Sequence, residues 1–217
     1  MSNKRLVIIE GMPGSGKTTY ATMISHKLTS WEVPHRCILE QEKHHPLMIP
    51  EYKFTSLADD GQADVFIQQL QIRFEAFVQD RLQSGQNVTI IESVLFQDVI
   101  NCAHHMGMNR AKLLQFASTL QRIVAPLQPV LIYFYQVHVE GQWRFICSVR
   151  GNVWGPVSLH TDDDFREAGT LWSGSQAFVR AIVDSWDIPK LIIENKDYVW
   201  DEYSKRITDF IFEHIVR

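Results

Sequence analysis

Cysteine is scarce in this chain, and its three cysteines are odd in number and widely scattered. Cys37, Cys102 and Cys147 show neither the pairing of a disulfide framework nor the close spacing of a metal site. The adjacent pairs His44–His45 and His104–His105 also lack metal-site spacing, because neighbouring side chains on a strand or helix diverge. We therefore expect reduced thiols in a cytoplasmic protein that has no dedicated metal site of its own.

Long apolar runs and an excess of positive charge are also missing. No stretch approaches the length needed to span a membrane, and the first expected strand lies too close to the N-terminus to leave room for a signal peptide. With 21 basic against 25 acidic residues, a net charge of −4 and a pI near 6.1, the chain lacks a basic face. We expect neither nucleic acid nor a membrane as partner, and the oligomeric state stays open.

Internal repeats, low-complexity segments and linkers are absent from the sequence as well. A length of 217 residues suits one sizeable α/β domain, and a hydrophobic content of 45% can supply its core. We therefore expect a single domain over residues 1–217.

The most specific motif that the chain does contain is G-x-x-x-x-G-K-S/T, filled by residues 11–18. It follows the apolar run Leu6–Ile9, which suits a strand buried on both faces, and it precedes Ala21, Ile24 and Leu28 at helical spacing. This order of strand, glycine-rich turn and helix is the context that a phosphate-binding P-loop requires. Its glycines let the backbone approach a phosphate, and the N-terminus of the following helix favours an anion.

Within the motif, Lys17 is expected to reach the β- and γ-phosphates of a nucleotide, and Thr18 to offer its hydroxyl to Mg²⁺. The competing interpretation, a glycine-rich turn with an unrelated lysine, fits the strand and helix context poorly. The residues expected to bind the nucleotide here are Gly11, Met12, Pro13, Gly14, Ser15, Gly16, Lys17, Thr18 and Thr19.

Apolar runs alternate with helical patterns along the rest of the chain. Further strands are expected at 36–40, 87–92, 130–134 and 190–194, and further helices around 66–85, 93–105, 113–123, 139–149, 178–186 and 207–215. This alternation predicts a five-stranded parallel sheet covered by helices on both faces, which is a three-layer α/β fold. Gly85 is expected just after the second helix as its C′ residue, and residues 151–164 are expected to form a loop.

Three glutamates, Glu10, Glu40 and Glu92, close expected strands, and ligands of open α/β sheets bind beyond such strand ends. Glu92 has the pattern of a Walker B acid that holds Mg²⁺ through water opposite Thr18, although it could instead cap a helix. Glu40, or Glu42 beside it, could take a proton from a substrate hydroxyl, although both could belong to a solvated turn. Glu10 suits a structural acceptor for loop N–H groups.

Phosphoryl transfer also needs cations that stabilise the moving group. Arg144 and Arg150, which follow the fourth expected strand, are the candidates. The adjoining residues Gly151, Gly155 and Pro156 have the composition of a mobile flap, so we expect a lid region at 139–164.

In these features the chain resembles the P-loop kinases of the nucleoside and nucleotide kinase group, and it looks closest to little-characterised bacterial P-loop kinase-like proteins. The matching stretches are I-I-E-G-M-P-G-S-G-K-T-T, L-E-Q-E-K-H-H-P, I-I-E-S-V-L-F-Q, P-V-L-I-Y-F-Y-Q and K-L-I-I-E-N-K-D-Y-V-W. They span nearly the whole length, but only the first is highly specific. The resemblance implies the P-loop NTPase fold with an arginine-bearing lid, and transfer of phosphoryl groups from ATP with Mg²⁺.

The resemblance also implies roles for single residues. Glu40 matches a strand-end carboxylate that acts as base in deoxynucleoside-kinase-like members, and Arg150 lies where a lid arginine is expected. Asn195 and Asp197 fall where such kinases wrap the adenine. The chain departs from the family at Ser93, which follows Glu92 where related enzymes often have an arginine. The role of that arginine is therefore either missing here or carried by another residue.

These observations predict an ATP-dependent kinase that acts on a hydroxyl of a small molecule, which is nucleoside-like, an amino sugar or antibiotic-like. The alternatives are a nucleotide-dependent switch and a kinase of nucleotides or nucleotide sugars. A switch would need N-K-x-D, whereas Asn195-Lys196-Asp197 places its aspartate one position early. Acids outnumber bases in the segment expected to line the acceptor pocket, which would repel a phosphate: Glu40, Glu42, Glu51, Asp59, Asp60 and Asp64 against Lys43 and Lys53.

Overall fold

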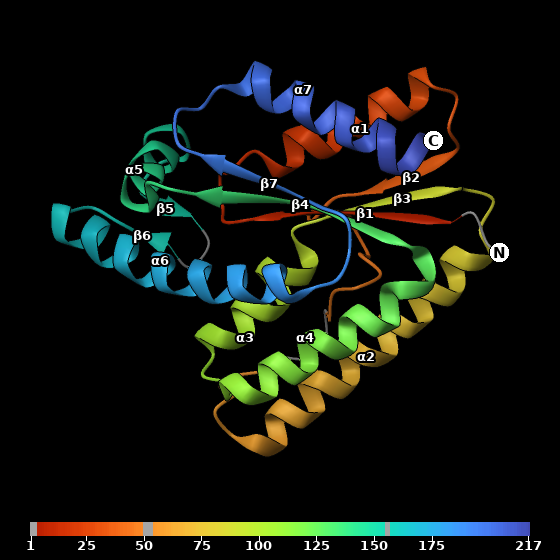
Figure 1. Cartoon of the computed structure of the whole chain (residues 1–217). Helices are drawn as coiled ribbons and strands as arrows, with labels where there is room; N and C mark the ends of the chain where they lie inside the picture. Colours follow the sequence, from red (N-terminus) through yellow and green to blue (C-terminus); the bar gives the residue numbers. More distant parts are fainter. Residues whose placement is uncertain (1–3, 50–53, 155–156) are drawn as a thin grey trace.

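The computed structural model describes residues 4–49, 54–154 and 157–217, and a five-stranded sheet runs through its centre (Figure 1). The strands are β1 (Arg5–Gly11), β2 (His35–Ile38), β3 (Val88–Glu92), β4 (Pro129–Gln136) and β7 (Lys190–Asn195). They lie in the order β2-β3-β1-β4-β7, and every neighbouring pair is parallel. The predicted five-stranded parallel sheet is therefore confirmed, with the P-loop strand β1 at its middle.

The alternation of side chains along β1 divides the core into two layers. Leu6 and Ile8 belong to one hydrophobic cluster, and Val7 and Ile9 belong to the other, and all four are completely buried. A strand that is apolar on both faces requires a cover on both, which explains its unbroken apolar run.

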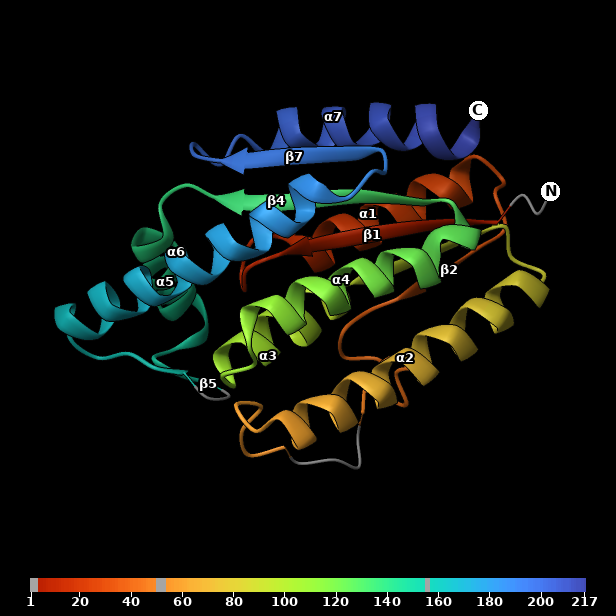
Figure 2. The same cartoon turned by 60° about the horizontal axis from the view of Figure 1, so that its bottom comes forward.

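Helices supply these covers, as Figures 1 and 2 show. On one face lie α1 (Lys17–Ser30) and α7 (Trp200–Ile211), continued by the π-helical turn η3 (Phe212–Val216). The other face carries helices whose bounds are α2 (Asp60–Gln83), η1 (Val94–Asn101), α3 (Cys102–His105), α4 (Arg110–Val124) with the 3₁₀ turn η2 (Ala125–Leu127), and α6 (Asp162–Ser185). None of the helices in the described part of the chain has the length and apolarity needed to cross a membrane.

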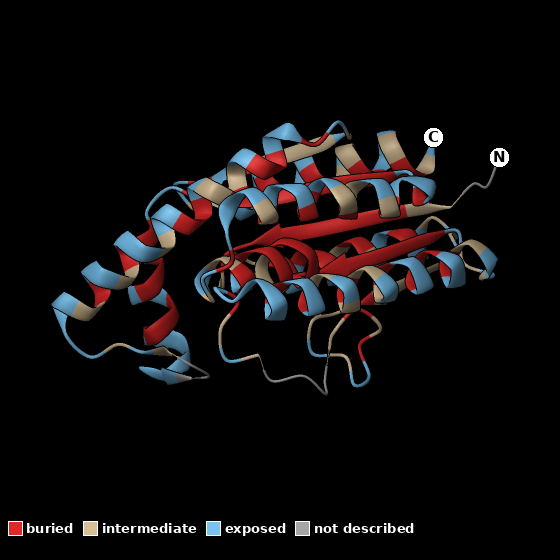
Figure 3. Cartoon of the chain, turned by 90° about the horizontal axis from the view of Figure 1, so that it is seen from below, coloured by how far each residue is buried: buried red, intermediate tan, exposed pale blue. Residues whose placement is uncertain are grey.

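A smaller portion projects beyond the sheet at the carboxyl ends of its strands (Figure 3). It consists of α5 (Val139–Arg150), the hairpin strands β5 (Val153–Trp154) and β6 (Val157–Ser158), and the first half of α6. A separate cluster that includes Trp143, Ile146 and Phe165 holds it together. This portion covers most of the region expected to be a lid, residues 139–164.

The structure corrects the expectation of a loop over residues 151–164. A hairpin occupies part of this segment, and α6 begins at Asp162, well before the helical pattern recognised in the sequence. Thr161 and Asp164 form a capping box, so the acidic triplet is the first turn of a helix, where negative charge is favourable. Gly155 and Pro156 of the expected flap lie outside the described residues.

Two element ends also differ from expectation. β2 stops at Ile38 instead of residue 40, because the chain turns away and the Glu40 N–H donates to the Glu92 carboxylate. The residue that follows α2, Ser84, has an extended conformation. Gly85, the next residue, does not take the left-handed conformation expected of a C′ glycine. The segment after β3 is helical as predicted, but its first part, η1, is a π-helix.

Candidate active site

The P-loop connects the end of β1 to the first residue of α1. Gly11, Gly14 and Gly16 all have positive φ angles, of 152°, 72° and 93°. A Cβ on Gly11 would lie 2.7 Å from the Phe134 carbonyl oxygen, and one on Gly14 would lie 2.5 Å from Ile146, so neither position has room for a side chain. The motif therefore forms the compact turn ahead of a helix N-terminus that binds phosphate in other proteins.

Lys17 is nearly buried beneath this turn. Its Nζ donates to the Met12 carbonyl oxygen at 3.0 Å and to Gln97 Oε1 at 2.6 Å. Burial lowers the pKa of Lys17, while surrounding carboxylates, led by Glu92 and Glu10, oppose that shift. This buried ammonium is thus held by two neutral acceptors among several carboxylates.

Thr18 and Glu92 are brought together as the sequence predicted. Thr18 Oγ1 donates to Glu92 Oε1 at 2.9 Å, and the same carboxylate accepts from Ser93 Oγ at 2.7 Å and from the Glu40 N–H at 3.1 Å. Thr18 is exposed, whereas Glu92 is buried behind it. Hydroxyl and carboxylate oxygens suit Mg²⁺, and this order, with the hydroxyl in front, fits an ion that contacts Thr18 directly and Glu92 through water.

Glu10 is a structural acceptor for backbone N–H groups, as expected from the sequence. Its two carboxylate oxygens accept from the backbone N–H groups of Leu95 at 2.6 Å and Gln97 at 3.1 Å. Burial, helped by the charge of Asp98, raises the pKa of Glu10 to about 8, against the lowering effect of the backbone of Phe96 and Gln97 and of the Lys17 charge. Glu10 thereby fixes the first turn of η1 at the edge of the site.

Asp98, on η1, is a carboxylate that the sequence analysis missed. Its Oδ2 is buried without a hydrogen-bond partner, and burial, helped by the charge of Glu40, raises the pKa of Asp98 to about 7. Of the two glutamates considered as bases, Glu42 is paired with Arg36 at 2.6 Å, so Glu40 is the one that acts on Asp98 and Lys17. In the sequence, the one feature that could have indicated Asp98 is its position within two helical turns of the end of the third expected strand.

Several of the described acids of the segment 40–64 have partners away from the candidate site. Asp59 caps α2 by accepting from the Gln62 N–H, and Asp60 and Asp64 both pair with Lys112 at 2.8 Å. Glu51 and Lys53 lie outside the described residues. For Asp59, Asp60 and Asp64, the expectation that they line the acceptor site is therefore not supported, because helix capping and ion pairing already occupy them.

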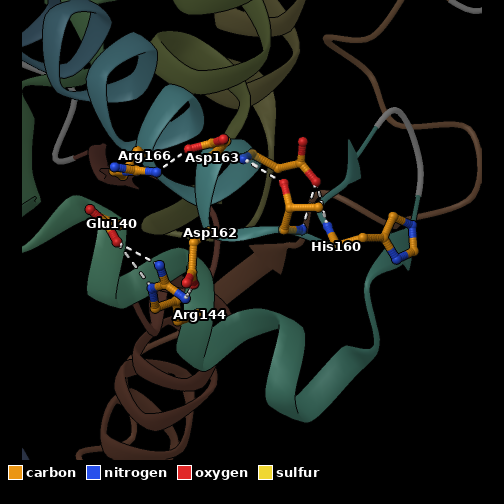
Figure 4. Close-up of polar contacts among 8 residues, drawn as sticks. Glu140, Arg144, His160, Asp162, Asp163 and Arg166 are labelled. Atoms are coloured by element: carbon orange, nitrogen blue, oxygen red, sulfur yellow. Dashed lines mark hydrogen bonds and ion pairs between the residues drawn. The ribbon is translucent and has the colours of Figure 1, made fainter.

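Arg144 of the expected lid is held within that portion (Figure 4). It pairs with Glu140 and Asp162, both at 2.8 Å, and its guanidinium lies over the Phe165 ring. Arg150 is exposed at the last residue of α5. In this structure Arg144 therefore joins α5 to α6.

A polar contact of α5 with the P-loop comes from another residue, Gln142. Its Nε2 donates to the Gly14 carbonyl oxygen at 2.8 Å, and its Oε1 accepts from Tyr198 at 2.9 Å. Tyr198 in turn accepts from Gln136 at 3.1 Å, and Gln136 Oε1 accepts from Asn195 at 2.9 Å. Asn195, expected near the adenine, is thus completely buried in an amide network.

Asp197, the other residue expected near the adenine, is exposed in the turn after β7. A groove beside the P-loop is lined instead by Trp200 and Tyr20 together with Gly16 and Thr19. The partly exposed Trp200 ring offers a flat apolar surface next to the phosphate-binding turn, which suits a nucleobase. Sequence reasoning missed it, because a tryptophan at the start of a helix has no distinctive pattern.

Comparisons with solved structures place this architecture among known folds. Searches against protein-family models and curated protein sequences found no match. The YorR protein of Bacillus subtilis, solved in complex with phosphorylated GDP, is similar over 96% of this chain and 97% of its own, with a TM-score of 0.55 and 16% identity. The fold is the three-layer P-loop NTPase fold.

Two thymidylate kinases support the same conclusion. The enzyme of Ehrlichia chaffeensis has a TM-score of 0.53 and 11% identity over 97% of this chain and 98% of its own. That of Candida albicans has a TM-score of 0.50 and 14% identity over 97% and 92%. At such low identities the likeness concerns the fold alone, which confirms the three-layer architecture around the P-loop.

Proposed function

We propose that this chain is a kinase that transfers the γ-phosphoryl group of Mg-ATP to a hydroxyl group of a small molecule. The observation that carries the proposal is the convergence of Lys17, Thr18 and Glu92 at one edge of the sheet, next to the unpaired carboxylate oxygen of Asp98. These are the phosphate, metal and proton-accepting parts that phosphoryl transfer requires.

Each residue has a separate task in this proposal. The N–H groups of the P-loop and the Lys17 ammonium would bind the phosphates, with Lys17 exchanging Gln97 for a phosphate oxygen. Thr18 and Glu92 would hold Mg²⁺, which neutralises charge on the phosphates. A carboxylate at the same edge would accept the hydroxyl proton, and the groove beside Trp200 would take the adenine.

A hydroxyl acceptor is favoured over a phosphate acceptor, although thymidylate kinases share the fold. A phosphate acceptor must be clamped by arginine or lysine and needs no base. Arg144 is engaged by two carboxylates, and the one charged residue of η1 is the acid Asp98. These charges support an uncharged acceptor group.

The proposal is tested by Lys17→Ala, which should lower ATP turnover by about a hundredfold or more, as the loss of a transition-state donor does. ADP release would be followed with nucleosides, amino sugars, other hydroxylated compounds and nucleoside monophosphates as acceptors. Lys27→Ala, at an exposed position of the same helix, is the matched control, and circular dichroism would check both folds. Wild-type turnover in Lys17→Ala would overturn the proposal, and turnover with monophosphates alone would overturn its hydroxyl acceptor.

A further inference from the structure

A cavity of about 430 Å³ lies on the face of the sheet that α2 and η1 cover. Its size is that of a small-molecule site. Phe66 and Leu70 of α2 form one side, and residues 47–49 and Phe54 of the preceding loop form another. The third side comes from η1 and α3, including Asp98 and Cys102.

The walls of this cavity are strongly apolar. Phe54 and Phe66 meet edge to face with ring centroids 5.3 Å apart, and Met48 and Met106 add flexible thioether side chains. Among the described residues that line the cavity, Asp98 carries the one charged side chain. An apolar chamber with one polar group suits a ligand that has an apolar body and one polar end.

Asp98 connects the cavity to the phosphate site. Gln97, its neighbour on η1, accepts the hydrogen bond from Lys17, while Asp98 lines the cavity and keeps its Oδ2 without a partner. The charges of Glu40 and Lys17 both act on the Asp98 carboxyl, so it shares the electrostatic surroundings of the P-loop lysine. Burial also raises its pKa to about 7, in the range where a carboxylate accepts protons effectively at neutral pH.

We propose that this cavity is the acceptor site, that it takes an alcohol with an apolar, ring-bearing body, and that Asp98 accepts the proton of its hydroxyl. This inference rests on the proposed kinase function and narrows its substrate class. Amino sugars and phosphate esters fit poorly, because each buried polar group without a partner costs about 1–3 kcal/mol.

The chemical step balances without a further reactant. The hydroxyl oxygen of the alcohol forms a bond to the γ-phosphorus of ATP as the bond from that phosphorus to the β,γ-bridging oxygen breaks. The bridging oxygen keeps the electron pair and leaves with ADP, and the hydroxyl proton passes to Asp98 Oδ2. The products are a phosphate monoester, ADP and a protonated Asp98 that releases its proton to water.

The experiment uses naphthylethanol as the probe, first for binding and then as an acceptor. Binding to the full chain is measured without ATP by ligand-observed NMR. Cys102→Trp, at an exposed position of the cavity wall, should weaken binding at least tenfold by filling the cavity. Leu114→Trp, on the exposed side of α4, is the matched control and should leave binding unchanged.

Asp98→Asn separates proton transfer from binding. It should lower kcat for naphthylethanol phosphorylation at least a hundredfold, because general-base catalysis contributes about 10²–10⁴, and should change the dissociation constant less than threefold. A wild-type kcat in Asp98→Asn would overturn its role as base.

The remaining outcomes distinguish this inference from the proposed function. Naphthylethanol that fails to bind, or that binds equally well to Cys102→Trp, overturns the cavity assignment. Phosphorylation of a nucleoside or an aminoglycoside with naphthylethanol inert also overturns it, while leaving the kinase intact. If no acceptor supports ATP turnover, the proposed function fails, and the effect of Cys102→Trp on binding alone then decides whether the cavity takes an apolar ligand.

Discussion

At the scale of single residues, four carboxylates at the carboxyl edge of the sheet differ in their partners, and those partners assign their parts. Glu10 accepts from two backbone N–H groups, and Glu92 accepts from Thr18, Ser93 and a backbone N–H. Asp98 retains an oxygen without a partner. A carboxylate whose acceptor sites are filled can hold structure or metal, whereas an unfilled one can accept a proton. The charge of Glu40 raises the pKa of Asp98, which suits Glu40 to tuning the base.

The division between Glu40 and Asp98 predicts a shift in the pH profile of the reaction. The rate should rise with pH through about 7, because Asp98 must be ionised to accept a proton, and its pKa is raised by burial and Glu40 and lowered by Lys17. Glu40→Gln removes a negative charge that raises this pKa, so the midpoint should move to lower pH with less than a tenfold loss in kcat at high pH. Glu42→Gln should leave the midpoint in place, because the Glu42 carboxylate of the wild type is paired with Arg36. A large kcat loss in Glu40→Gln at every pH would instead make Glu40 the base.

At the scale of elements, α5 is tied to the nucleotide side of the protein through Gln142. Its side chain joins the Gly14 carbonyl to the Tyr198 hydroxyl, and thus the P-loop to the turn after β7. Gln142→Leu keeps the volume but leaves both partners unsatisfied, at a cost of about 1–3 kcal/mol. We expect the dissociation constant for ATP, measured by titration, to rise about tenfold, with a smaller change in kcat. Ser148→Ala, on the exposed side of the same helix, is the control, and equal ATP affinity in Gln142→Leu would refute the coupling.

The elements also show how far the sequence alone predicts this structure. β1, β3 and β4 were predictable because each is a run of mostly apolar residues that is almost completely buried, and the P-loop because its spacing is specific. The first half of α6 was not, because it projects from the sheet, exposes residues such as Leu171 and packs through only a few apolar side chains, Phe165, Ala168 and Trp172. The roles of Asp98 and Gln142 could not be predicted, because they depend on contacts with residues far away in the chain, which a local sequence pattern does not reveal.

At the scale of the whole molecule, the P-loop strand is the centre of both layers and of the site. β1 pairs with β3 on one side and β4 on the other, and its last residues carry Glu10 and the glycine turn. The same residues therefore contribute to the stability of the core and to the candidate site. A change in the protonation of Glu10 should therefore change the free energy of unfolding of the entire chain.

This arrangement predicts that part of the folding stability is lost as pH rises. Burial raises the pKa of Glu10 from 4.5 to about 8, so the folded chain binds this proton more tightly than the unfolded chain does. Its contribution is therefore fully present below pH 4.5 and disappears as the pH rises through about 8. Asp98 acts in the same direction, whereas His104 and His105, whose pKa values burial lowers, act in the opposite direction below pH 6.5.

The contribution of Glu10 is isolated by comparing urea unfolding of the wild type and Glu10→Gln at about pH 6 and about pH 8.5. Between these values the wild type should lose more free energy of unfolding than the variant, by at least about 1.4 kcal/mol, the equivalent of one pKa unit. Glutamine does not titrate, and groups that do not interact with Glu10 cancel in the difference, which therefore reports Glu10 together with its effect on Asp98 and Lys17. Glu75→Gln, exposed on α2, should retain the wild-type pH dependence. Parallel pH profiles for Glu10→Gln and the wild type would mean that Glu10 keeps one protonation state across this range, held ionised by its backbone donors.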